Sequence, residues 1–148
     1  MIIMANVSTV IKKAKSFYGY SESNGKAQRY VISPWNSWTK RKVNCKVTPW
    51  CEIFVGSVMY QCKVSYTKTA GCKQAASYYK KAKRWKSKSA TPSVGDQVFV
   101  KGYTHTGIVT KVTTSTITYI SGNCSNAVRY STIKRSGKID GYGRPRYS

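Results

Sequence analysis

Hydrophobic side chains in the first part of the chain follow the period of a helix. Residues 7–17 place Val, Ile, Ala and Phe three or four positions apart. Asn6 or Ser8 can cap the start of this run, and Gly19 can end it. The pattern predicts an amphipathic helix near the N-terminus.

A second apolar series follows Pro49. Residues 50–62 repeat large apolar side chains on one helical face, which predicts a buried central helix that begins within a residue or two of this proline. Residues 70–88 predict a third helix with a basic outer face, which fades into a loop at 86–91. Residues 20–49 are rich in Ser, Asn, Lys and Trp without a clean period, so we expect a loop with at most one short helical turn.

After residue 91 the hydrophobic period falls to two. Residues 92–103, 104–123 and 141–147 are rich in β-branched and aromatic side chains and are divided by Gly, Asn and Ser turns, which predicts short antiparallel strands. Helices followed by strands are typical of an α+β fold. We expect one domain over residues 1–148, without a separate cell-wall-binding domain.

The charge of the chain adds a class of partner to this picture. Lys and Arg number 26 against four carboxylates, a formal charge of +22 that is spread along the whole sequence. Such a field attracts polyanions, including nucleic acids, anionic lipid headgroups and cell-wall polymers. No run of 18 apolar residues is present, so we expect no transmembrane segment. The stretch "MIIMANVSTVIKKAK" lacks the layout of a signal peptide, and we expect none.

The few cysteines, histidines and carboxylates exclude several enzyme classes. Five Cys without a CxxC pair and a single His, His105, argue against a structural zinc site and against a zinc amidase. Glycosidases use two carboxylates that flank the scissile bond, and no such pair is evident. Cys62, Cys72 and Cys124 are expected to be small buried apolar side chains. We expect no cofactor and no metal.

Three residues form a candidate catalytic group. Cys51 falls in the first turn of the predicted central helix, where the helix N-terminus stabilises a thiolate. His105 lies at the start of a predicted strand, and Asn123 lies at the end of the next one. A thiolate, an imidazole that moves the proton and an amide that orients the ring suffice for attack on a carbonyl group.

Five ordered motifs resemble those of the CHAP domain, the cysteine, histidine-dependent amidohydrolase/peptidase of phage endolysins and bacterial wall hydrolases. The resemblance extends from about Tyr18 to Tyr147, and its motifs are "PWCEIFVGSVMYQC", "PSVGDQVFV", "THTGIVTKV", "ITYISGN" and "GYGRP".

This resemblance implies a papain-like fold that cleaves amide or peptide bonds in peptidoglycan. Carried over by position, Cys51 is the nucleophile, His105 the base and then the acid, and Asn123 the residue that orients the imidazole. Members of the family often carry Glu two positions before this Asn, whereas this chain has Ser121, which places more weight on Asn123. Some members bind calcium ahead of the nucleophile. Glu22 is the only carboxylate there in this chain, so we expect no such site.

Residues beside the candidate catalytic group have simpler structural roles. Trp50 is expected to close the substrate cleft, although a Trp at this place can equally be core packing. Glu52 is expected to complement the dipole at the start of the helix. Asp96 is expected to stabilise a turn through backbone amides. The backbone N–H of Cys51 is the expected oxyanion donor.

The sequence thus predicts a thiol-dependent peptidoglycan hydrolase, either an N-acetylmuramoyl-L-alanine amidase or a peptide-bridge endopeptidase. We expect a monomer that is made in the cytoplasm, acts at the wall after release in a phage-type lysis, and binds anionic wall polymers such as teichoic acids through its charge. No specific nucleic acid is expected. The alternative is a basic, non-catalytic binding protein for wall polyanions or nucleic acid, suggested by "SYYKKAKRWKSK".

Overall fold

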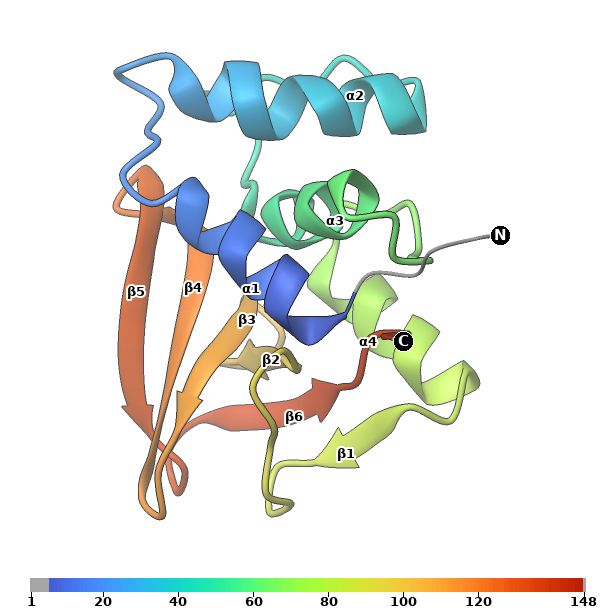
Figure 1. Cartoon of the computed structure of the whole chain (residues 1–148), viewed down its shortest axis with the longest axis vertical. Helices are drawn as coiled ribbons and strands as arrows, with labels where there is room; N and C mark the ends of the chain where they lie inside the picture. Colours follow the sequence, from blue (N-terminus) through green and yellow to red (C-terminus); the bar gives the residue numbers. More distant parts are fainter. Residues whose placement is uncertain (1–5, 148) are drawn as a thin grey trace.

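The computed structural model describes residues 6–147. Residues Met1–Ala5 lie outside this range. They begin the stretch "MIIMANVSTVIKKAK", for which no signal peptide is expected. Figure 1 shows the elements in chain order, and their bounds are α1 (Val7–Ser16), the π-helical turn η1 (Gln28–Ile32), α2 (Ser33–Thr39), α3 (Cys51–Gln61), α4 (Cys72–Lys81), β1 (Trp85–Ser87), β2 (Gln97–Val100), β3 (His105–Val112), β4 (Thr116–Cys124), β5 (Ala127–Lys134) and β6 (Ile139–Gly143).

The six strands form one antiparallel sheet in the order β1-β6-β2-β3-β4-β5. Strands β3, β4 and β5 run along the long axis of the molecule, while β6 and β1 cross its lower end (Figure 1). The register shifts between Phe99 and Val100 and between Val109 and Lys111, and such irregularities increase twist and let a sheet bend. The predicted α+β fold, helices first and an antiparallel sheet after, is confirmed.

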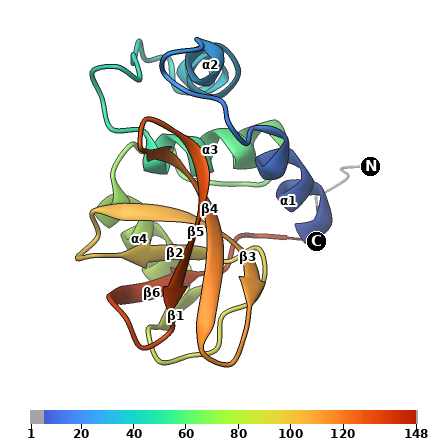
Figure 2. The ribbon, with the colours of Figure 1, turned by 90° about the vertical axis from the view of Figure 1, so that its left-hand side faces the viewer.

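Helix α3 lies between α2 and the sheet in both views (Figures 1 and 2). Every residue from Cys51 to Met59 is buried, so the helix is enclosed on all sides rather than on one face. A helix with apolar side chains on all sides is stable only where the rest of the protein covers it. The sheet therefore holds the N-terminus of a rigid, water-excluded helix beside the strand that carries His105.

Helix α1 is the element that the sequence predicts most closely. The Asn6 side chain accepts a hydrogen bond from the Thr9 backbone N–H at 2.9 Å and so caps the first turn. Val10 and Ala14 are buried on the face that meets the core. The predicted amphipathic helix is confirmed, and of the two candidate caps, Asn6 and Ser8, the structure uses Asn6.

The loop predicted for residues 20–49 is wrong in its middle. Residues 28–39 are helical, and the run ends where Lys40 adopts a left-handed conformation with φ of 58°. Val31, Ile32 and Trp35 are fully buried there. Their burial against α3 stabilises a helix that has little periodic signal of its own, because tertiary packing overrides a weak local pattern.

Two strands also differ from the prediction. Trp85–Ser87, placed within the third helix and the loop after it, pairs with β6 as an edge strand, and α4 ends at Lys81. Strand β5 falls in a stretch where no strand was predicted, and it pairs with β4 along most of its length. Its alternating side chains are mostly exposed, so it lacks the apolar alternation that signals a strand.

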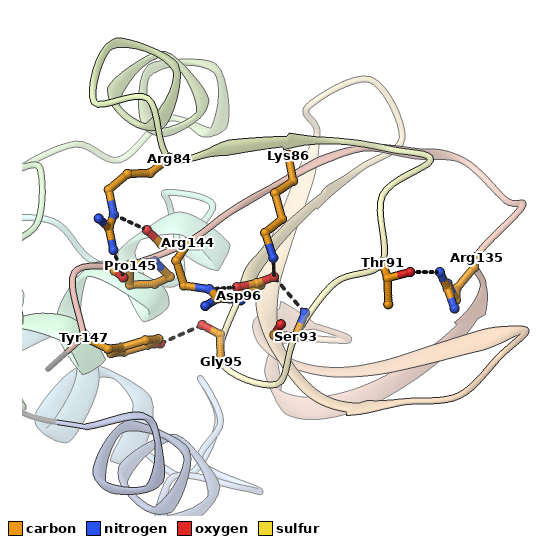
Figure 3. A network of polar contacts seen from close by, with 10 residues as sticks. All are labelled: Arg84, Lys86, Thr91, Ser93, Gly95, Asp96, Arg135, Arg144, Pro145 and Tyr147. Atoms are coloured by element: carbon orange, nitrogen blue, oxygen red, sulfur yellow. Dashed lines mark hydrogen bonds and ion pairs between the residues drawn. The ribbon is translucent and has the colours of Figure 1, made fainter.

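The C-terminal segment is tied to the sheet by polar contacts around Asp96 (Figure 3). Asp96 is fully buried, accepts a hydrogen bond from the Ser93 backbone N–H at 2.8 Å, and forms ion pairs with Arg144 and Lys86. The predicted turn-stabilising role of Asp96 is confirmed and extended, since the same carboxylate also anchors two cations. Within the described range, no helix is long and apolar enough to cross a membrane.

Candidate active site

Cys51 is the first residue of α3. The residue is 7% exposed, so it is largely shielded from water. The unpaired N–H groups at a helix start carry partial positive charge and favour an anion there. The fold therefore places this thiol where its ionised form is stabilised, as its sequence position predicts.

Cys72, the first residue of helix α4, contacts this sulfur. The two Sγ atoms lie 3.9 Å apart in a buried contact. The sequence predicts only a packing role for Cys72. The available signal is its place in the first turn of a helix, which it shares with Cys51, but the distance between the two helix starts depends on the tertiary fold.

The surroundings lower the pKa of Cys51 to about 5. The largest cause is the hydrogen bond with the Cys72 thiol; burial opposes it, and hydrogen bonding and positive charge from His105 act in the same direction as Cys72. The pKa of Cys72 is raised, first through its hydrogen bond to Cys51 and then through burial. Cys51 is thus the thiolate of the pair, and Cys72 is the donor.

His105 begins β3 and is half-buried. Its Nε2 lies 3.0 Å from the Oγ of Ser121, a fully buried residue of the neighbouring strand β4. His105 of β3 and Ser121 of β4 therefore meet directly, and the imidazole also acts on Cys51 of α3, since it lowers the pKa of that thiol. A neutral hydroxyl makes the contact with the ring.

Asn123 follows two positions later on β4, but its backbone departs from the regular strand conformation. Regular strand alternation would place both side chains on one face. The register of β4 and β5 shifts between Ser121 and Cys124, and Asn123 has φ of 57°, in the left-handed region that Asn tolerates. Within residues 6–147, no hydrogen bond joins Asn123 to His105. Asn123 thus lacks a described hydrogen bond to the imidazole, and its orienting role stays a prediction.

Trp50 is fully buried, so its side chain offers no surface to a substrate in this structure. Its Nε1–H donates to Glu22 Oε2 at 3.0 Å, and a Cβ added at Gly122 would lie 2.6 Å from its ring. Trp50 therefore packs beneath the end of β4 and supports the site from inside. The predicted cleft-closing contact is replaced by core packing, because Gly122 lets the strand lie directly on the indole.

Glu52, the neighbour of Cys51, is enclosed in a buried polar cluster. Gln97 Nε2 donates to Glu52 Oε1 at 2.6 Å and to Thr106 Oγ1 at 2.9 Å, and the Tyr79 hydroxyl donates to Gln97 Oε1 at 2.8 Å. The Tyr66 hydroxyl oxygen lies 2.8 Å from both Glu52 Oε2 and Gln97 Oε1.

The cluster fits a protonated Glu52. Tyr66 has one hydroxyl hydrogen for two neighbouring oxygens, and a proton on Glu52 supplies the second hydrogen bond. Burial raises the pKa of Glu52 well above its usual value, in the same direction. Glu52 is thus enclosed in a buried hydrogen-bonded cluster, and its expected action on the helix dipole stays a prediction.

Alkylation of Cys51 is expected to follow a low-pH titration. Because the thiolate is the reactive form, the iodoacetamide rate should be high above the pKa and fall as pH drops through about 5. Cys72→Ala removes the hydrogen-bond donor and should move the midpoint upward, toward the ordinary thiol value. Cys62→Ala, a buried cysteine outside this contact, is the matched control and should leave the midpoint unchanged. Peptide mapping of label at each pH measures the midpoint, and a wild-type midpoint near the ordinary thiol value would contradict the assignment.

The other cysteines do not add to this group. All five are free; Cys45 and Cys62 are buried, and burial raises the pKa of both. Cys62 and Cys72 are buried as predicted, whereas Cys124 is only half-buried, because it lies in the irregular end of β4. Residues 6–147 contain no cluster of three His, Cys, Asp or Glu side chains that could hold a metal ion.

Residues 42–123 match the CHAP domain family. This match covers more than half of the 148 residues and includes Cys51, His105, Ser121 and Asn123. Comparison with curated proteins and with solved structures found no match. The antiparallel sheet with a buried helix at its face agrees with the CHAP fold. The chain therefore belongs to the CHAP domain family, whose members are cell-wall hydrolases of the amidase or peptidase type.

Proposed function

We propose that this protein is a peptidoglycan hydrolase in which Cys51 is the nucleophile and His105 the general base and acid. The observation that carries the proposal is the thiol at the start of a buried helix, with its pKa lowered by Cys72 and His105. A thiol ionised at neutral pH is the requirement for nucleophilic attack.

The reaction follows the geometry of the site. The Cys51 sulfur attacks the carbonyl carbon of an amide, and the oxyanion that forms accepts a hydrogen bond from the Cys51 backbone N–H at the helix start. His105 then donates a proton to the leaving nitrogen, which departs as an amine and leaves a thioester. Water attacks the thioester while His105 removes its proton, and the acid product and the Cys51 thiolate are released.

The contact of His105 with Ser121 supports separate roles for its two nitrogens. Because Nε2 lies 3.0 Å from Ser121 Oγ, we propose that Nδ1 exchanges the proton with the Cys51 sulfur. We therefore propose Ser121 as the residue that orients the ring, in place of the Asn123 role predicted from sequence. The hydroxyl holds the ring plane without adding a charge to the site.

Two variants separate these candidates. Ser121→Ala removes the contact to Nε2 and should lower kcat by about 10- to 100-fold with little change in KM, since an orienting partner acts on the reacting groups. Asn123→Ala should reduce kcat less, because no described hydrogen bond links it to the imidazole. Rates on purified walls, with melting curves for both variants, measure the difference. A larger kcat loss for Asn123→Ala would return the orienting role to Asn123.

The proposal also covers the bond that is cleaved and the binding of the protein to the cell wall. The substrate is an amide or peptide bond of peptidoglycan, cleaved as by an endolysin-like N-acetylmuramoyl-L-alanine amidase or an endopeptidase. The charge of +22 supports binding to anionic wall polymers such as teichoic acids after release from the cytoplasm. Charge-driven binding of this kind weakens as salt rises, so wall binding that is insensitive to salt would contradict this part.

Product analysis of digested peptidoglycan tests the proposed reaction. Mass spectrometry should find new peptide amino groups or peptide-free glycan strands, and no new reducing sugar ends. Free lactyl carboxyl groups on the glycan would identify an amidase, and cleaved cross-bridges an endopeptidase. New reducing ends would show glycosidic cleavage and would contradict a thiol mechanism.

A further inference from the structure

The pair formed by Cys51 and Cys72 is close enough to become a covalent bond. Their Sγ atoms are 3.9 Å apart, and a disulfide needs about 2.05 Å, so the two sulfurs must approach by about 2 Å. Each residue is the first of its helix, where a side chain can rotate without disturbing the helical turns after it. Among the described residues, no other pair of cysteine sulfurs is in contact.

We propose that Cys51 and Cys72 form a reversible disulfide when a peroxide oxidises Cys51, and that this bond switches the enzyme off. The switching part rests on the proposed function, because it requires Cys51 to be the nucleophile. The disulfide itself depends only on the two sulfurs and the oxidant.

The chemistry balances in two steps. The Cys51 thiolate attacks one peroxide oxygen, the O–O bond breaks, and Cys51 becomes a sulfenic acid while the second oxygen leaves as water after taking up a proton. The Cys72 sulfur then attacks the Cys51 sulfur, the S–S bond forms, and the S–O bond breaks. The departing hydroxide takes the Cys72 proton and leaves as a second water. The two sulfurs lose two electrons, and the peroxide gains them.

The two thiols suit these separate steps. Because its pKa is lowered, Cys51 provides the thiolate that peroxide oxidises. Cys51 is also 7% exposed, so it is not fully enclosed against an oxidant as small as peroxide. The hydrogen bond to the Cys51 thiolate is the first cause of the raised pKa of Cys72. Oxidation of Cys51 removes that negative charge, so Cys72 ionises more easily when it has to attack. Cys72 therefore resolves the sulfenic acid before further oxidation makes the damage irreversible.

A peptide map reads the bond without any assay of wall lysis. The reduced protein is treated with hydrogen peroxide at a small molar excess, free thiols are blocked under denaturing conditions, and trypsin is added without reductant. Cys51 falls in the tryptic peptide 47–63 and Cys72 in the peptide 69–73. The expected product is these two peptides joined, in a protein lighter by two hydrogen atoms. Wall clearing should fall at least tenfold and recover when a dithiol is added.

Two variants define the thiols involved. Cys72→Ser should show no joined peptides, and its Cys51 should accumulate oxygen adducts that a dithiol does not fully reverse. Cys62→Ser is the matched control, because Cys62 shares the peptide 47–63; the joined pair should persist in it. Loss of the pair in Cys62→Ser, or oxidation of Cys51 in the wild type without a joined pair, would overturn the proposal. A protein that is joined at Cys51 and Cys72 and still clears walls at full rate would overturn the switch and the proposed role of Cys51, and leave the disulfide standing.

Discussion

Cys51→Ala is expected to abolish wall clearing, with a loss of about 1,000-fold or more in rate on Gram-positive cells or purified walls. The reason is that no other described thiol combines a helix start with a pKa lowered by its surroundings. Loss of the sulfur leaves neither a nucleophile nor the thioester path. Turbidity loss measures the rate for both proteins at equal concentration.

The control for this result is folding. Alanine fits the first turn of a helix and leaves only a small gap beside Cys72, so the melting temperature should change little. Cys62→Ala provides a second control, since it removes a buried thiol outside the site and should keep full activity. If the folded Cys51→Ala protein cleared walls as fast as the wild type, or if neither cleared them, the basic-binder alternative would replace the enzyme.

Asp96→Ala should produce the largest loss of stability, about 3 kcal/mol in the free energy of unfolding. The change leaves the Ser93 N–H without its acceptor and removes the buried partner of Arg144 and Lys86. Because these two side chains are 36% and 32% exposed, their charges can regain water, which keeps the loss toward the lower end for a broken buried pair. Urea unfolding followed by circular dichroism measures it.

Asp140→Ala is the matched control for this prediction. Asp140 is only half-buried and accepts hydrogen bonds from the Gly102 and Tyr103 backbone N–H groups, without an ion pair among the described contacts. Its removal should cost about 1 kcal/mol, the ordinary contribution of such hydrogen bonds. Equal losses for the two variants would show that the cations around Asp96 contribute nothing.

The α+β class, helix α1 with its Asn6 cap and the buried helix that starts at Cys51 could all be predicted because each has a strong local pattern. Helix α2 and strand β5 could not. The first is stabilised by Trp35 and its neighbours packing on α3, and the second by pairing with β4. Neither contact leaves a periodic apolar signal in the segment itself, since each element is stabilised by its contacts with a neighbouring element.

In the candidate site, too, local features could be predicted from the sequence and contacts between elements could not. Sequence order and motif spacing predicted the helix start at Cys51 and the strand start at His105, and the structure places both there. A regular strand would place Ser121 and Asn123 on one face, and the irregular end of β4 departs from that alternation. From its sequence position Glu52 is expected to act as a charge at a helix start, and only the fold shows that it is buried in hydrogen bonds with Tyr66 and Gln97, with its pKa raised.

Residue types and short-range spacing define the chemistry that is available: one imidazole, few carboxylates, a thiol at a helix start and a large positive charge. These properties are independent of the rest of the fold. Which groups meet depends on the fold, because contacts between elements fix the distances. The 3.9 Å contact of Cys51 with Cys72 requires the starts of α3 and α4 to lie side by side, and the 3.0 Å contact of His105 with Ser121 requires the pairing of β3 with β4.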